Sequence, residues 1–239
     1  AISNSGAIEV VSNNAATGAA VLSFAGDAVV VNSGDIDVAT TAQKYYSATG
    51  ILAFAANGQA YVNNSGDVSA DWSSGIGYGS ARAVDAQGQQ GVTVVNSGSL
   101  YANGKYAYGV YALSSGGDVV VHNAESGEIG FYSYLGNGFG VLGISYLGDV
   151  VVDNDGAIGG YAFGQSAGVF GFACAGDVGV DNSGSIDLIS GNDVAVGVFA
   201  RADYGTATVI NSGDITALSG YNGYAGDSAY GILARGAYA

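Results

Sequence analysis

Three side chains that could carry out acid–base chemistry recur at one position of a sequence pattern. His122, the only histidine, directly precedes Asn123. Asp153 precedes Asn154, 31 residues later, and Asp181 precedes Asn182, a further 28 residues along the chain. A histidine held beside carboxylates can transfer protons as a general acid or base. The alternative is a cross-strand His–Asp pair on a solvated surface. We favour this alternative and predict no catalytic residue.

A second group of charged side chains is a file of aspartates in Gly-Asp-Val triplets: Asp118, Asp149 and Asp177. Carboxylates stacked about 4.8 Å apart, the spacing of neighbouring strands, repel one another, so they shift their pKa values or recruit cations. Calcium would be the cation, because it accepts oxygen ligands in flexible geometry. The Gly-Gly-x-Gly-x-Asp calcium repeat is absent. We therefore expect a solvated acidic face, with a Ca²⁺ column as the alternative, and no other metal or cofactor.

Aromatic residues gather in segments rich in glycine and serine. Aromatic faces stack on sugar rings and pack on apolar protein surfaces, so these segments are the candidate binding loops. The residues are Tyr45, Tyr46, Trp72, Tyr78, Tyr106, Tyr132, Tyr134, Tyr161, Tyr221 and Tyr224.

All of these groups are placed by one repeated pattern, Val-x-Val-x-Asn, a small polar residue, Gly, then x-Ile. It is clearest in the run from Gly148 to Ile158. The glycine that marks each copy recurs at intervals of 28, 32, 32, 29, 29, 28 and 29 residues: Gly6, Gly34, Gly66, Gly98, Gly127, Gly156, Gly184 and Gly213. A period near thirty that is kept over the whole chain is typical of a solenoid.

Strand alternation explains the pattern, because residues i, i+2 and i+4 of a strand share one face. In the copy at Val150, Val152 and Asn154, the valines and the asparagine therefore face the interior, and Asp153 faces outward. An asparagine stacked on its equivalent in the next repeat can form a ladder of amide hydrogen bonds. The predicted ladder consists of Asn4, Asn32, Asn64, Asn96, Asn123, Asn154, Asn182 and Asn211.

Two further strands complete each repeat. After the glycine corner, a second strand points Ile158 and its equivalents inward, and a third strand begins at a glycine, as in Gly140-Val141-Leu142-Gly143-Ile144. The spacing i, i+3, i+4 of an amphipathic helix is absent, and the 42 glycines disfavour long helices. We predict an all-β, right-handed parallel β-helix of eight coils with three strands per coil, forming one domain over residues 1–239.

The third strands predict an apolar stripe along the rod. Small residues such as Val141 and Gly143 should face inward. The larger partners would then face outward in pairs, and the alternatives are that loops cover them or that the two faces are reversed. The outward pairs are Leu22/Phe24, Leu52/Phe54, Tyr111/Leu113, Leu142/Ile144, Phe170/Phe172, Phe199/Arg201 and Leu233/Arg235. A long exposed apolar patch marks an interaction surface.

Composition limits the partners. The net charge is −15 with five Lys and Arg residues, which disfavours nucleic acid and anionic membranes, because both need clustered positive charge. No run of eighteen apolar residues is present, so we expect no membrane span. Cys174 is the only cysteine, which excludes an intrachain disulfide framework, and we expect it to be an inert thiol.

The run Gly-Asp-Val-x-Val-x-Asn-Ser-Gly-x-Ile, followed by a loop and Gly-Val/Ile-x-Ala, resembles the repeats of bacterial autotransporter passenger domains and related haemagglutinin-type adhesins. The resemblance covers essentially the whole chain and is more specific for the architecture than for a ligand. It implies an extracellular protein of the bacterial cell surface, secreted through the outer membrane. It also implies that this chain is a fragment or a processed unit of a longer secreted chain.

Three functions are compatible with these observations. The leading one is a non-enzymatic adhesin-type rod that binds a host or sister-cell surface, through glycan or protein, by its Tyr- and Gly-rich loops. The second is a structural subunit that associates end to end into a filament. The third, a polysaccharide-degrading β-helix enzyme, is disfavoured, because the sequence lacks the Asn-Thr-Asp, Gly-His-Gly and Arg-Ile-Lys motifs of polygalacturonase-like enzymes.

Overall fold

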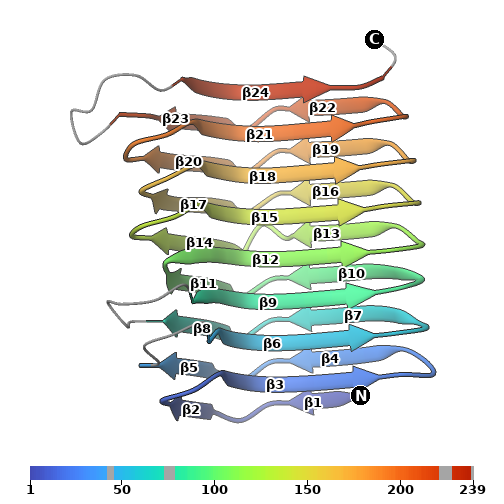
Figure 1. The fold of residues 1–239 in the computed structure, drawn as a ribbon, viewed down its shortest axis with the longest axis vertical. Coiled ribbons are helices and arrows are strands. Elements are labelled where there is room, and N and C mark those ends of the chain that lie inside the picture. Colours follow the sequence, from blue (N-terminus) through green and yellow to red (C-terminus); the bar gives the residue numbers. More distant parts are fainter. Residues whose placement is uncertain (42–45, 73–78, 221–227, 238–239) are drawn as a thin grey trace.

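The computed structural model describes residues 1–41, 46–72, 79–220 and 228–237. These residues form 24 β-strands and no helix. The strands make three parallel sheets of eight strands each, stacked into one rod (Figure 1). The predicted all-β parallel solenoid with three strands in each repeat is therefore confirmed.

Each sheet takes every third strand of the chain. The first sheet contains β1 (Ile2–Asn4), β4 (Ala28–Asn32), β7 (Gln59–Asn64), β10 (Gly91–Asn96), β13 (Val119–Asn123), β16 (Val150–Asn154), β19 (Val178–Asn182) and β22 (Ala207–Asn211). The second contains β2 (Ile8–Ser12), β5 (Ile36–Thr40), β8 (Asp67–Trp72), β11 (Ser99–Gly104), β14 (Glu128–Ser133), β17 (Ala157–Ala162), β20 (Ser185–Ser190) and β23 (Asp214–Leu218). The third contains β3 (Ala16–Ser23), β6 (Ala48–Ala55), β9 (Ser80–Gly88), β12 (Tyr106–Ser114), β15 (Gly138–Ser145), β18 (Ser166–Ala173), β21 (Ala195–Ala202) and β24 (Ala229–Arg235).

We call three consecutive strands a coil, so that β1–β3 form the first coil and β22–β24 the eighth. The register between coils is the one that the repeated pattern predicts: Val152 pairs with Val121 and Val180, and Asn154 pairs with Asn123 and Asn182. Equivalent residues therefore stack in files along the rod.

The interior is a narrow core of Val, Ile, Leu and Ala from all three sheets. In β16, Val150 and Val152 are buried, while Val151 is exposed and Asp153 half-buried on the outer face. Burial of each valine contributes roughly 1.5–3 kcal/mol. This contribution, repeated in every coil, is what folds a chain so rich in glycine.

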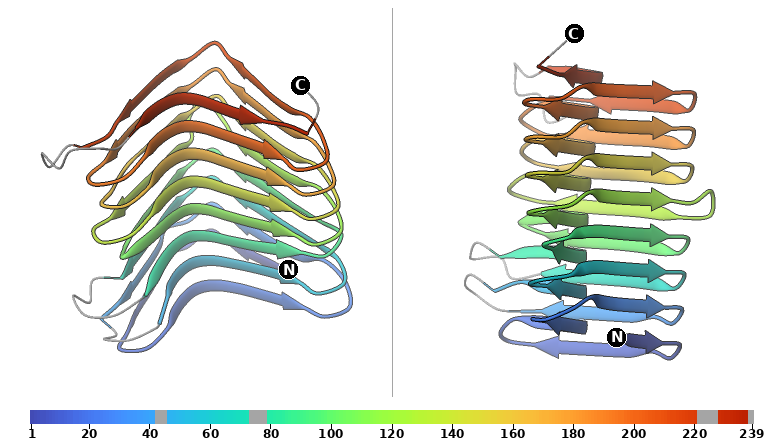
Figure 2. Two further views of the ribbon diagram at one scale, coloured as in Figure 1. Left: turned by 45° about the horizontal axis from the view of Figure 1, so that its top comes forward. Right: turned by 90° about the vertical axis from the view of Figure 1, so that its right-hand side faces the viewer.

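The strands of the third sheet bend along their length, so the outer face of this sheet is concave (Figure 2). In β15 the alternation of faces shifts at Gly140. A Cβ built on this glycine would lie 2.3 Å from Ile158 Cγ2, inside the core, and the next residue, Val141, is also fully buried. Phe139 and Leu142 consequently both lie on the outer face, one on each side of the bend.

The predicted facing of the third strands is confirmed, since Ile51 and Ala53 are fully buried and Leu52 is half-buried on the outer side. The reversed alternative is therefore wrong. One register needs correction: Leu22, and not Phe24, pairs with Phe54 across the sheet, although the Phe24 ring lies edge-on to that of Phe54 with centroids 6.4 Å apart. The segment between the second and third strands is shorter in the first coil than in the second. Because the length of this segment varies, the sequence repeat does not fix the register of the third strand.

Candidate binding surface on the third sheet

Five aromatic rings form a continuous series across the coils on the outer face of the third sheet. Tyr111 packs edge-on against Tyr108, with ring centroids 5.8 Å apart, and Tyr108 stacks on Phe139 at 5.7 Å. Phe139 meets Phe170 edge-on at 5.7 Å, and Phe170 stacks on Phe199 at 4.7 Å. With Leu142, which packs in the same cluster, we call this series the aromatic face.

The bend of the sheet explains why these outward side chains are partly shielded. Phe139 is 8% exposed and Leu142 is 9% exposed, although both lie on the outside of the sheet. Tyr108 and Tyr111 come from opposite sides of the same bend and pack against this cluster. The apolar stripe predicted from the sequence is thus present, and its own rings cover much of it.

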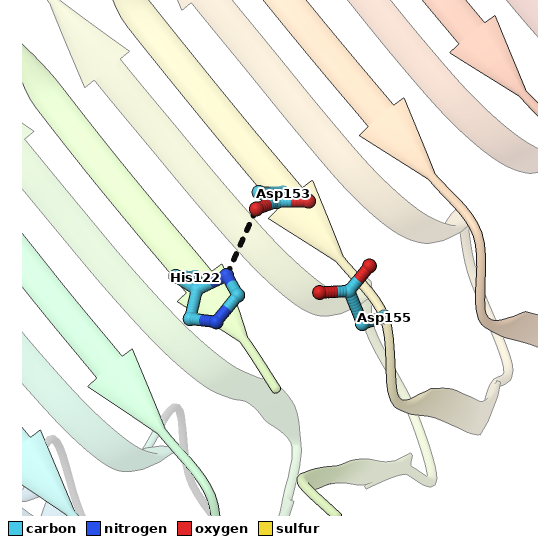
Figure 3. A group of neighbouring side chains, drawn as sticks. All are labelled: His122, Asp153 and Asp155. Carbon is cyan, nitrogen blue, oxygen red and sulfur yellow. Dashed lines mark hydrogen bonds and ion pairs between the residues drawn. The ribbon is translucent and has the colours of Figure 1, made fainter. Parts of the chain in front are cut away.

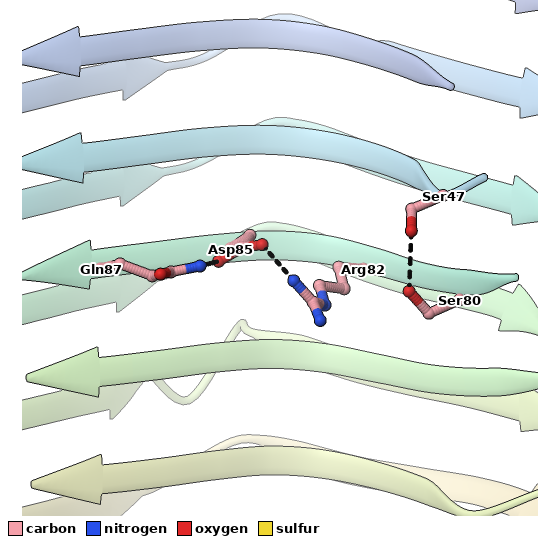
Figure 4. A network of polar contacts seen from close by, with 5 residues as sticks. All are labelled: Ser47, Ser80, Arg82, Asp85 and Gln87. Atoms are coloured by element: carbon pink, nitrogen blue, oxygen red, sulfur yellow. Dashed lines mark hydrogen bonds and ion pairs between the residues drawn. The ribbon is translucent and has the colours of Figure 1, made fainter. Parts of the chain in front are cut away.

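The third coil borders the aromatic face with a polar cluster of Arg82, Asp85 and Gln87, all on β9 (Figure 4). Arg82 Nη1 donates to Asp85 Oδ2, and Gln87 Nε2 donates to Asp85 Oδ1 at 2.8 Å. The Arg82 guanidinium lies over the Tyr111 ring, 4.4 Å from its centroid, and 5.5 Å from that of Tyr108. Asp85 is only 4% exposed.

This polar cluster is not predicted from the sequence pattern. The glycine at the bend is the signal that identifies a third strand in the sequence, and in β9 Ala83 stands at that position. The available signal was the pairing of an arginine and an aspartate three residues apart in a chain with only five positive side chains.

Burial raises the pKa values of the Tyr108 and Tyr111 phenols. The Arg82 guanidinium acts in the opposite direction and offsets part of the increase in both. Both tyrosines are therefore neutral hydrogen-bonding groups at physiological pH, and the charged pair beside them is formed by Arg82 and Asp85.

The assignment of Trp72 to a binding loop is wrong. Trp72 is the last residue of β8 and is fully buried, continuing the inward alternation of Val68 and Ala70. Its ring stacks on Tyr134 at 6.1 Å with an interplanar angle of 3°. Gly79 leaves room for the indole, because a Cβ built there would lie 2.2 Å from Trp72 Nε1. Trp72 therefore fills the core at a corner.

The other predicted aromatic residues differ in position. Tyr106, Tyr132 and Tyr161 lie within strands β12, β14 and β17, so they are not in loops as predicted. Tyr132 and Tyr161 stack at 5.3 Å on the outer face of the second sheet, away from the aromatic face. Tyr46 lies outside the strands and is exposed. Tyr45, Tyr78, Tyr221 and Tyr224 lie outside the described residues.

The asparagines form an unbroken ladder through the corner between the first and second sheets. Each Nδ2 donates to Oδ1 of the next asparagine, at 2.8 Å from Asn4 to Asn32 and 2.7 Å from Asn182 to Asn211. The five intervening bonds are 2.6–2.9 Å long. Each Nδ2 also donates to the carbonyl of the corner glycine in its own coil, as Asn154 does to Gly156. The ladder is a structural device.

The aspartate file holds the turns that lead into the first sheet. Asp118 Oδ1 accepts from the backbone N–H of Asp149 at 2.9 Å, and Asp149 Oδ1 accepts from that of Asp177 at 2.8 Å. Asp177 repeats this contact with Thr206 at 2.7 Å. One oxygen of each carboxylate is therefore engaged with the next coil, which gives the file a structural role.

His122, Asp153 and Asp155 are the one group of three or more metal-type ligands that lies close together in the described parts of the chain (Figure 3). His122 Nδ1 lies 3.0 Å from Asp153 Oδ2, and the three ligand atoms lie within 4.8 Å of one another. All three side chains are half-buried, and Ser183 Oγ donates to Asp155 at 2.6 Å. The predicted cross-coil His–Asp pair is present, whereas Asp181 stacks beside Asp153 on the far side from His122.

Comparisons with known protein families, curated protein sequences and solved structures find no match to this chain. Within the described residues, no helix has the length and apolar character needed to cross a membrane. The class that the fold defines is the parallel β-solenoid repeat proteins, and the site is an aromatic outer face with one buried polar cluster.

Proposed function

We propose that this protein is a non-enzymatic adhesin-type rod of the bacterial cell surface, similar to an autotransporter passenger domain, and that it binds its partner along the aromatic face. The observation that carries this proposal is the series of five rings from Tyr111 to Phe199. A solenoid needs no such series on its outer side, because its strands are already held by the core and the backbone ladder.

The aromatic face is better suited to binding the surface of a partner than to enclosing a substrate. Half-buried rings on a rigid sheet lose little conformational freedom when a partner covers them, and each offers a large contact area. Equivalent positions repeat from coil to coil, so an extended partner can make the same contact several times. Such multiplied weak contacts suit attachment to a surface.

The test is to remove one ring from the middle of the series. Phe170→Ser should weaken binding of the purified protein to immobilised cell-surface glycans, matrix proteins and whole cells by at least tenfold. The matched control is Val151→Ser in the same coil, which changes an exposed apolar residue on the first sheet. Circular dichroism and the melting temperature establish that both variants are folded.

Retention of full binding by folded Phe170→Ser, or equal loss in both variants, would contradict a role for the aromatic face. Turnover of a polysaccharide by the wild-type protein, abolished by His122→Ala, would contradict the non-enzymatic assignment.

A second candidate function, end-to-end association, is favoured by the polarity of the asparagine ladder. Every amide nitrogen points toward the next coil, so Asn211 presents Nδ2 at one end of the described ladder and Asn4 presents Oδ1 at the other. A further coil or a second copy could continue the ladder at either end. Filaments in electron micrographs of the purified chain, lost on Asn211→Leu, would support this function.

A further inference from the structure

We propose that the polar cluster of Arg82, Asp85 and Gln87 is the specificity site of the aromatic face and that it binds a neutral, hydroxyl-rich oligosaccharide. This inference rests on the proposed function, because it assigns a ligand class to the same surface.

The repeats provide an internal comparison. In every other coil the positions equivalent to Arg82 and Asp85 carry no charge; the pairs are Thr17/Ala20, Thr49/Leu52, Tyr108/Tyr111, Phe139/Leu142, Ala167/Phe170, Val196/Phe199 and Tyr230/Leu233. The fold therefore forms without an ion pair at this place. Because a buried ion pair is often no more stabilising than apolar residues of similar volume, stability alone does not explain why the third coil has one.

The cluster is also incompletely satisfied. Arg82 Nε is buried and has no hydrogen-bond partner among the described residues. The amide of Gln87 donates to Asp85, and Gln87 itself is half-exposed beside the cluster. A buried polar group without a partner is uncommon in folded proteins and needs an explanation. A ligand that reorders the cluster on binding is the explanation that we propose for Arg82 Nε.

A pocket lies beside the cluster and shares Gln87 with it. Phe54 and Leu113 give the pocket apolar walls, and Gln89 and Ser115 add an amide and a hydroxyl. Its remaining lining residues are Ala55, Ala56 and Gly88. An aromatic and apolar wall with amide and hydroxyl groups matches the two surfaces of a sugar ring, one of C–H groups and one of hydroxyls.

Charge points to a neutral ligand. The Arg82 guanidinium is balanced by the Asp85 carboxylate, so the cluster has no net charge to offer an anion. The net charge of −15 also disfavours the approach of acidic polysaccharides. Hydroxyl groups can accept from the guanidinium and donate to the Gln87 carbonyl without an uncompensated charge.

The decisive variant gives the third coil the residues of the second, as Arg82→Thr with Asp85→Leu. A glycan array and then titration calorimetry would use neutral gluco-, galacto- and manno-oligosaccharides and their uronic-acid counterparts as probes. We expect the wild-type protein to bind at least one neutral series, and the double variant to lose at least tenfold in affinity with an unchanged or raised melting temperature. Gln87→Leu should also weaken binding.

The matched control is Arg201→Thr with Asp203→Leu, which removes another Arg–Asp pair, with Nε and Oδ1 2.8 Å apart, from the seventh coil. This control should keep neutral-glycan binding. Equal loss in the two double variants, preference for acidic glycans or for polypeptide at this site, or wild-type affinity of the Arg82/Asp85 variant would overturn the inference. If Phe170→Ser loses binding while the Arg82/Asp85 variant keeps it, the proposed function stands and only the neutral-glycan site fails.

Discussion

Asn123 and Asn154 are joined by a hydrogen bond of 2.8 Å from Nδ2 to Oδ1, although they lie 31 residues apart in the chain. The same Nδ2 of Asn123 donates to the Gly127 carbonyl at 3.2 Å, within its own coil. One amide therefore fixes the corner of its own coil and the position of the next coil above it. Every coil depends on its neighbour for this contact.

Asn154→Ala should lower the free energy of unfolding by about 1–3 kcal/mol, the cost of one buried polar group left without its partner. The buried Oδ1 of Asn182 loses its donor, whereas Asn123 Nδ2 keeps its bond to the Gly127 carbonyl. Urea unfolding measures the loss. Asn4→Ala is the control, since Asn4 is only half-buried and bonds to one asparagine; its cost should be smaller. Equal costs for the two variants would contradict cooperation along the ladder.

The ladder and the facing of the strands follow from the sequence because they depend on two periods, that of strand alternation and that of the coil. Val152 and Asp153 are neighbours with opposite environments for this reason alone. The same alternation predicts that Trp72 is buried, since it continues the inward positions of Val68 and Ala70. The serines and glycines that follow Trp72 in the sequence favour a loop instead, and they are the reason for the wrong assignment.

The aromatic face itself could not be predicted in detail, because it depends on the bend of the third sheet. The shift of alternation at Gly140 places Phe139 and Leu142 on one face, three residues apart, which breaks the period of two. The polar cluster of β9 depends on the same bend, since Arg82 and Asp85 also lie three residues apart on one face. The residues of a single strand do not indicate where its alternation of inner and outer faces will shift.

Gly140→Ala should destabilise the protein by about 1–3 kcal/mol, the usual range for an overpacked core. The new Cβ would lie 2.3 Å from Ile158 Cγ2 and 2.6 Å from the Gly168 carbonyl oxygen, and backbone cannot move away cheaply. The third coil has Ala83 at the position of Gly140, and Leu100 takes the place of Ile158 in the next coil. A leucine branches one carbon further from the backbone than an isoleucine, which leaves room for the alanine Cβ.

Gly179→Ala is the matched control, because a Cβ at this outer position of β19 would meet no atom within 4 Å. This variant should be neutral or more stable by up to about 1 kcal/mol, since alanine restricts the unfolded chain. Thermal unfolding compares the two variants. A destabilised Gly179→Ala together with an unaffected Gly140→Ala would contradict the assignment of inner and outer faces.

Asp149→Asn should leave stability nearly unchanged, because the amide oxygen can accept from the Asp177 N–H as the carboxylate does. Asp149→Ala should cost about 1 kcal/mol, the contribution of one hydrogen bond. The measurement is the melting temperature of each variant with and without Ca²⁺. If calcium raises the melting temperature of the wild-type protein and Asp149→Asn removes that effect, the file is a cation column and the structural role assigned to it is incomplete.

Stability should fall in strongly alkaline solution through the buried tyrosines. Burial and the nearby Asp71 carboxylate raise the pKa of Tyr134 from 10.0 to about 12, and burial also raises the pKa values of Tyr108 and Tyr111. The folded state thus favours the neutral phenols, so their contribution is complete below pH 10 and is lost as the pH rises toward 12. Unfolding curves at successive pH values, read beside tyrosinate absorbance, measure this loss. Tyr134→Phe removes one of the three groups and should make the decline shallower, and an unchanged profile would show that Tyr134 ionises equally in the folded and unfolded chains.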